Sequence, residues 1–221
     1  VLENDSMPGA RWFPGATLNF AEHLLRHRGS KPAIIRYLEN GDRRETSYDQ
    51  LRSDTGALAY WLRQQGIQAG DRVVGIMPNI TETVVGMLAT TSLGGIWSSC
   101  SPDFGVQGLL DRFGQVEPQI LICCDGYFYN GKRVDCREKI RDVVAQLPSV
   151  KKVLVVPVLD AHPDISMFAN ALPWEEALGH ACEPEFVPQP FAHPLYIMYS
   201  SGTTGMPKCI VHSAGGTLLQ H

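Results

Sequence analysis

Three features that would assign a function at once are missing from this sequence. None of its six cysteines forms a C-x-x-C pair, so a zinc ribbon is not expected and the thiols should be free. The longest candidate for an apolar span, Val153–Leu159, is far too short to cross a membrane and contains a proline. The formal net charge is −4 and the basic residues are scattered, whereas nucleic-acid binding needs a basic face. The sequence therefore predicts neither a membrane nor a nucleic-acid partner.

The two ends of the chain also lack familiar signals. The first residues, Val1–Asp5, do not show the basic, apolar and small-residue order of a signal peptide, so we expect a cytoplasmic protein. There is no starting methionine, and the last residues read as a helix that begins near Ser213 without a closing glycine or proline. We therefore expect residues 1–221 to be the incomplete N-terminal part of a larger domain.

The composition and the order of the elements predict an α/β fold. Apolar residues make up 44% of the chain and charged residues 19%, as in globular proteins. Strand and helix patterns alternate, which is typical of a mostly parallel sheet flanked by helices. Strands are expected at residues 32–38, 72–77, 96–98, 119–124, 152–156 and 195–199, and helices at 48–66, 81–93, 105–116 and 137–147.

Local signals predict how several of these helices begin. Thr17 is expected to cap a helix over residues 18–25, and Asp103 to cap the helix that starts near Gly105. Residues 47–50 have the Ser-x-x-Gln pattern of a capping box. Trp97 occupies an apolar position and is expected in the core.

The most informative segment is Tyr199–Lys208, which follows an apolar strand directly. It reads Tyr-Ser-Ser-Gly-Thr-Thr-Gly-Met-Pro-Lys, with four hydroxyl residues and two glycines within six positions. Glycines allow backbone N–H groups to turn toward a ligand, and hydroxyls add further donors, so such a loop can form an anion site. Lys208 adds a mobile positive charge. From Phe186 to the end there is no Asp or Glu to repel a polyanion.

The spacing in this loop excludes two common nucleotide motifs. In a Walker A motif counted from Gly202, the second glycine would fall on Pro207, and Cys209 follows the lysine where Ser or Thr is required. The chain also has no G-x-G-x-x-G fingerprint of nicotinamide binding. On composition alone, an ordinary polar hairpin remains an alternative to a phosphate site.

The ordered string Tyr199–Lys208 resembles the signature phosphate loop of the adenylate-forming superfamily, which includes acyl-CoA synthetases, luciferases and adenylation domains. The following residues, Lys208–Gly216, resemble the extension found in synthetases for short-chain acids. Two further stretches resemble acetoacetyl-CoA synthetases: one is Pro8–Phe20, and the other is Trp97–Gly105, running on to Leu110–Phe113. The resemblance covers essentially the whole chain, but less than half of a full synthetase.

The resemblance implies a two-step ligase reaction. ATP and acetoacetate give acetoacetyl-AMP and pyrophosphate, and the thiol of coenzyme A then displaces AMP. It implies that Lys208 acts in catalysis and that the loop holds the ATP phosphates with Mg²⁺. The residues concerned are Ser200, Ser201, Gly202, Thr203, Thr204, Gly205 and Lys208. The adenine, ribose and hinge residues of the family and its C-terminal catalytic lysine would lie beyond His221, so the fragment alone is expected to be inactive.

A second expected site concerns coenzyme A. The resemblance places a basic hairpin tip after Asp125, and here that tip contains Lys132 and Arg133. The family's first arginine at this tip is replaced by Tyr129 and its second by Lys132, which weakens the correspondence. The dipeptide Asn130-Gly131 also predicts a type I′ turn for purely structural reasons, so both interpretations stay open.

Other functions also stay open at this point. The chain is also compatible with an acetyl- or propionyl-CoA synthetase, and with a non-catalytic phosphate-binding fragment. A Walker-type hydrolase is disfavoured by the spacing described above. The expected partners are the small molecules acetoacetate, ATP and CoA, and the oligomeric state is not predicted.

Overall fold

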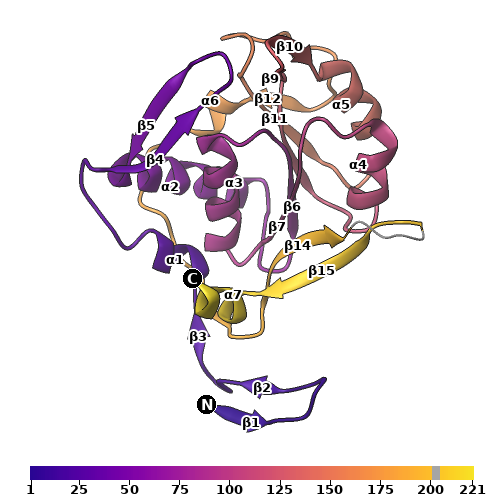
Figure 1. Cartoon of the computed structure of the whole chain (residues 1–221). Helices are drawn as coiled ribbons and strands as arrows, with labels where there is room; N and C mark the ends of the chain where they lie inside the picture. Colours follow the sequence, from indigo (N-terminus) through magenta and orange to yellow (C-terminus); the bar gives the residue numbers. More distant parts are fainter. Residues whose placement is uncertain (201–204) are drawn as a thin grey trace.

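The structure, a computed structural model, describes residues 1–200 and 205–221 and is built on a seven-stranded sheet (Figure 1). Parallel pairing joins all the strands except the last, β15, which runs antiparallel to β14. The expected α/β fold with a mostly parallel sheet is therefore confirmed. In spatial order the strands are β12 (Ala171–Pro173), β11 (Lys152–Val156), β8 (Ile120–Cys124), β6 (Arg72–Ile76), β7 (Ile96–Cys100), β14 (Pro194–Ser200) and β15 (Lys208–Ser213).

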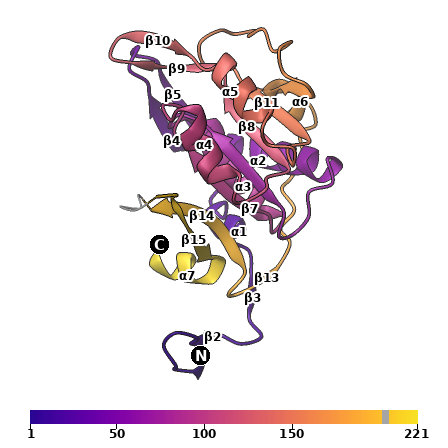
Figure 2. The ribbon, with the colours of Figure 1, turned by 90° about the vertical axis from the view of Figure 1, so that its right-hand side faces the viewer.

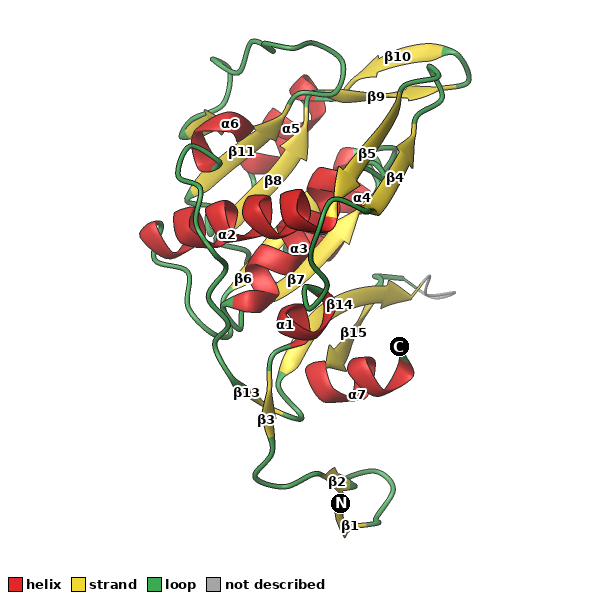
Figure 3. Ribbon diagram, turned by 90° about the vertical axis from the view of Figure 1, so that its left-hand side faces the viewer, coloured by secondary structure: helices red, strands yellow, loops and turns green. Residues whose placement is uncertain are grey.

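Helices cover both faces of this sheet (Figure 3). On β8, Ile120 and Ile122 pack into one core cluster, whereas Leu121 and Cys123 pack into the other. Because both faces are buried, the parallel strands read as continuous apolar runs rather than alternating ones. The first cluster lies under α1 (Phe20–Leu24), α2 (Tyr48–Gln64), α3 (Thr81–Ser92) and α6 (Trp174–Ala177), and the second lies under α4 (Val106–Phe113) and α5 (Arg137–Val144).

The expected start of α2 is confirmed in part. The Ser47 hydroxyl accepts a hydrogen bond from the Gln50 backbone N–H at 3.1 Å. The Gln50 side chain, however, donates to Asp54 at 2.7 Å instead of returning to residue 47. Only one half of the capping box is formed, which still satisfies one of the free N–H groups of the first turn.

The expected cap at Thr17 is wrong, because Asn19 takes that position. The Asn19 side-chain oxygen accepts from the Glu22 N–H, and its amide donates to the Ser92 carbonyl at 2.8 Å and the Val187 carbonyl at 2.9 Å. The amide has an acceptor oxygen and two N–H donors, so it caps α1 and bonds two distant carbonyls at once, whereas a threonine hydroxyl has a single donor. Thr17 instead lies in β3 (Thr17–Leu18), which pairs with β13 (Gln189–Pro190).

The expected cap at Asp103 is also wrong. The N-cap of α4 is Gly105, which offers no side chain, and Asp103 is exposed in the preceding turn. Glycine is tolerated at this position because the cap residue needs extended backbone more than it needs a particular side chain.

In the described part of the chain, three antiparallel hairpins lie outside the main sheet. They are β1 (Leu2–Asn4) with β2 (Arg11–Trp12), β4 (Pro32–Tyr37) with β5 (Arg43–Ser47), and β9 (Gly126–Tyr129) with β10 (Lys132–Asp135). In Figure 2 the first hairpin lies beyond one end of the sheet and β9–β10 lies at the other. At the tip of β9–β10, Asn130 and Gly131 have φ values of 49° and 71°, which confirms the expected type I′ turn. None of the helices described in residues 1–200 and 205–221 has the length and apolarity to cross a membrane.

Candidate functional site

The phosphate-loop candidate connects the last two strands of the sheet. The closing pairs of the β14–β15 ladder are Tyr199 with Cys209 and Ser200 with Lys208. Directly opposed residues of an antiparallel pair have Cβ atoms about 4.5–5.5 Å apart, so Lys208 lies beside Ser200 where the loop begins and ends. Gly205 has a φ of 120°, a backbone conformation that favours glycine. Ser201, Gly202, Thr203 and Thr204 lie outside the described residues.

The strand β15 itself was not predicted from the sequence. Residues 208–213 alternate weakly, and most of their side chains are exposed or half-buried on an outer strand. The strand exists because β14 offers it a free edge, which is a long-range condition that a local pattern does not carry.

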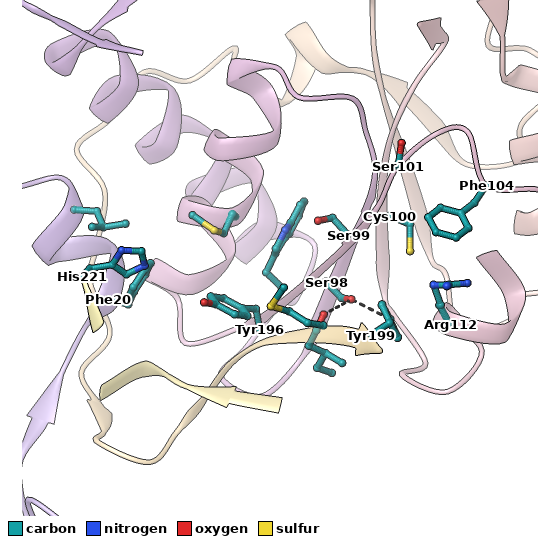
Figure 4. Close-up of a pocket in the computed structure, with 15 residues that line it drawn as sticks. Phe20, Ser98, Ser99, Cys100, Ser101, Phe104, Arg112, Tyr196, Tyr199 and His221 are labelled. Carbon is teal, nitrogen blue, oxygen red and sulfur yellow. Dashed lines mark hydrogen bonds between the residues drawn. The ribbon is translucent and has the colours of Figure 1, made fainter. Parts of the chain in front are cut away.

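A cavity opens where β14 separates from β7. The β6–β7 ladder has five residue pairs, but β14 pairs with β7 only at Tyr196–Trp97 and Ile197–Ser98. Beyond these pairs the carboxyl ends of the two strands diverge, and a cavity of about 580 Å³ lies between them (Figure 4). Its volume lies in the range of small-molecule sites. It is lined by Phe20, Leu24, Met87, Trp97–Ser101, Phe104, Arg112, Tyr196–Tyr199 and His221.

The wall of the cavity on the α4 side combines aromatic rings with one cation. The guanidinium carbon of Arg112 lies 4.2 Å from the ring centroid of Phe104 and 5.7 Å from that of Tyr199. The Ser98 hydroxyl donates to the Ile197 carbonyl at 2.8 Å and lies 3.0 Å from the Tyr199 hydroxyl. Burial raises the pKa of Tyr199 well above its usual value, so this phenol stays neutral.

Trp97 forms another part of the cavity wall. Trp97 is only 4% exposed, as expected, although its ring also borders the cavity. A Cβ atom added to Gly75 would come within 2.8 Å of this ring, and one added to Gly86 within 3.0 Å. The indole therefore occupies space that these two glycines leave open. On the α4 side of the cavity, burial raises the pKa of the Cys100 thiol to about 12, so it is protonated at neutral pH (Figure 4).

The structure places Lys132 and Arg133 in the β9–β10 hairpin, apart from the β14–β15 loop (Figures 1 and 2). The Arg133 guanidinium donates to the Leu159 carbonyl at 3.0 Å and to the Asp160 carboxylate at 2.5 Å. Lys132 is exposed next to the turn, opposite Tyr129. The structure thus does not bring the expected CoA residues and the expected phosphate loop together. Arg133 also forms an ion pair with Asp160, which the sequence did not indicate.

Asp125 is a buried residue that sequence reasoning missed as a structural element. Its side chain is 1% exposed and follows β8 directly. Its carboxylate accepts backbone hydrogen bonds from Val158 at 2.8 Å, Leu159 at 3.0 Å and Asp160 at 2.9 Å. These bonds fix residues 158–160, which include the two hydrogen-bond partners of Arg133, Leu159 and Asp160. A lone Asp at a strand end gives no signal of this role, because its partners lie more than 30 positions away.

Comparison with known proteins gives a consistent result. The chain is 51% identical to an acetoacetyl-coenzyme A synthetase of Rhizobium meliloti (strain 1021), covering 100% of this chain and 34% of that protein. It is 47% identical to the acetoacetyl-CoA synthetase of Xenopus tropicalis, covering 95% of this chain and 33% of that protein. The solved structure of the acetoacetyl-CoA synthetase from Streptomyces lividans matches with a TM-score of 0.94 at 45% identity, covering 100% of this chain and 34% of that one.

The chain therefore spans about a third of the length of the relatives it matches. The fold and the sequence agree with these relatives along essentially all of it. The family model described as "AMP-binding enzyme" matches residues 20–220. Since this match covers nearly the whole chain, the chain belongs to the AMP-binding enzyme family.

Proposed function

We propose that the protein carrying this chain is an acetoacetate–CoA ligase that forms AMP. In the first step a carboxylate oxygen of acetoacetate attacks the α-phosphorus of ATP, and pyrophosphate leaves. In the second step the sulfur of coenzyme A attacks the acyl carbon, and AMP leaves. The observation that carries the proposal is the β14–β15 hairpin with its Ser-Gly-Thr loop, within a chain that is 44–51% identical to named acetoacetyl-CoA synthetases.

The loop is proposed to hold the terminal phosphates of ATP. The assigned residues are Ser200, Ser201, Gly202, Thr203, Thr204, Gly205 and Lys208. Three observations support a fit to phosphate. The ladder places the Lys208 position beside Ser200, Gly205 has positive φ, and the stretch 186–221 contains no carboxylate side chain. The loop would act by neutralising charge and orienting the phosphates, and Lys208 would act in catalysis in this way. When bound with ATP, Mg²⁺ would supply further neutralisation of the phosphate charge.

The choice of acid is tested by a substrate panel on the intact protein. We expect acetoacetate to support ATP–pyrophosphate exchange with a kcat/KM at least about tenfold above those of acetate and propionate. A preference for acetate or propionate would instead identify a different short-chain ligase. Steady ATP hydrolysis in the absence of any acid would contradict the ligase proposal altogether.

The hairpin β9–β10 is proposed to contact coenzyme A through Lys132 and Arg133. Lys132 provides the cleaner test, because Arg133 already binds Leu159 and Asp160 and its loss would also affect stability. We expect Lys132→Ala in the intact protein to raise the KM for CoA about fivefold, through the loss of one exposed contact to phosphate, and to leave the KM for ATP unchanged. Lys31→Ala, which removes an exposed lysine before β4, is the matched control. An unchanged KM for CoA in the Lys132 variant would leave the hairpin as a structural turn only.

A further inference from the structure

The hairpin that carries the phosphate loop has few backbone bonds to the rest of the sheet. Its strand β14 pairs with β7 at two positions, and its other strand, β15, is joined in the sheet through β14. From Met198 onward the ladder to β7 ends, so the part of the hairpin nearest the loop depends on side chains for its position. The side-chain contacts of the residues next to the loop therefore indicate what holds the loop in place.

Arg112, in the last turn of α4, contacts the β14 side of the loop. Its guanidinium carbon lies 5.7 Å from the ring centroid of Tyr199, the residue that precedes Ser200. It is held in this orientation by the Phe104 ring at 4.2 Å and by a hydrogen bond from Nη1 to the Gly108 carbonyl at 2.7 Å. Figure 4 shows the guanidinium beside the Phe104 ring, with Tyr199 nearby. A planar guanidinium that packs against aromatic rings provides a specific and directional contact.

Gln115, two residues after α4, contacts the other side of the loop. Its side-chain amide donates to the Pro207 carbonyl at 2.9 Å and to the Asp111 carbonyl at 2.6 Å. Pro207 directly precedes Lys208, so this bond fixes the backbone from which the lysine extends. Residues 112 and 115 thus hold the two flanks of the loop from one short segment that belongs to a different layer of the fold.

We infer that Arg112 and Gln115 are positioning residues for nucleotide binding: they fix the spacing of Tyr199 and Pro207, and through these the place of Ser200 and Lys208. This inference rests on the proposed role of the loop in binding ATP. It adds that α4, which belongs to the crossover between β7 and β8, sets the geometry of a loop about 90 residues downstream. A displacement of about 1 Å at a reacting group can cost about a hundredfold in rate, so loss of these contacts would impair the loop without removing any phosphate ligand.

The test compares two glutamines of the same segment in the intact protein. Gln115→Met removes the donor to Pro207, whereas Gln107→Met removes an exposed donor that only reaches Asp111 within α4. We expect Gln115→Met to raise the KM for MgATP in pyrophosphate exchange about fivefold, with the KM for acetoacetate unchanged, because one hydrogen bond at the loop is lost. Gln107→Met should change neither value. Trypsin cleavage after Lys208 should be faster in Gln115→Met and should be slowed by MgATP.

Arg112→Lys provides a second, milder variant that keeps the charge and loses the planar stack. We expect a smaller rise in the KM for MgATP, of about twofold to threefold. If Gln115→Met folds poorly, this variant decides the question alone. The inference is overturned if the Gln115 and Arg112 variants match Gln107→Met, or if the KM values for MgATP and acetoacetate rise by the same factor. Lys208→Ala separates the two proposals, because normal activity in that variant would refute the role of the loop itself.

Discussion

Replacing Lys208 by alanine in the intact protein is expected to lower the rate of acetoacetyl-AMP formation by about a hundredfold to a thousandfold. The lysine is the first residue of β15 and pairs with Ser200 at the base of the loop, so its ammonium group would reach the phosphate oxygens at the proposed site. Its removal would leave negative charge uncompensated as the bond to pyrophosphate breaks. The measurement is ATP–pyrophosphate exchange with saturating acetoacetate, which reports the first step without CoA.

Two further variants make this result specific to the position. Lys208→Arg keeps the charge but changes its shape and hydrogen-bond geometry, so we expect partial activity, about tenfold above the alanine variant. Lys31→Ala removes an exposed lysine remote from the hairpin and should exchange pyrophosphate at the unaltered rate. Normal exchange by Lys208→Ala, with the fold intact, would refute the proposed phosphate site.

Replacing Asp125 by alanine is expected to destabilise the segment after β11 by about 2–4 kcal/mol. The change removes the acceptors of three backbone N–H groups, those of Val158, Leu159 and Asp160. Residues 158–160 are only half-buried or exposed, so water can replace part of the lost hydrogen bonding. The loss of stability is therefore smaller than it would be for fully buried N–H groups. Asp125→Asn retains one carbonyl oxygen in a side chain of similar size and should lose about half as much.

Hydrogen exchange followed by mass spectrometry on the intact protein measures this effect locally. Peptides that contain residues 158–160 should exchange about 30- to 1000-fold faster in the alanine variant, as the free-energy change requires. Asp142→Ala is the matched control, because Asp142 is exposed and pairs only with its neighbour Arg141. Equal protection of residues 158–160 in both variants would show that the carboxylate is not what holds this segment.

The sequence was sufficient for the features that local chemistry determines. The strand-helix alternation predicted the parallel sheet, and Asn130-Gly131 predicted the turn that the φ values confirm. The order of residues in Tyr199–Lys208 indicated the adenylate-forming family, and the family match agrees with it. The assignment of individual residues to ATP and CoA stays a prediction.

Long-range contacts account for what the sequence could not supply. Thr17 and Asn19 are both good capping residues, and the choice of Asn19 depends on the carbonyls of Ser92 and Val187. Likewise, nothing near Gln115 indicates that its amide reaches Pro207, 92 positions away. These long-range hydrogen bonds depend on how the helices pack on the sheet, so they can be identified only from the folded structure.

The packing of Trp97 on Gly75 and Gly86 links the interior of the fold to the volume of the cavity. The three residues share one fixed volume, so an added methyl group at either glycine has to displace the indole. The same ring borders the cavity, and its displacement would narrow the room left for a ligand. The volume of the cavity thus depends on two interior positions that carry no side chain, and a larger residue at either one is expected to change the room left for a ligand.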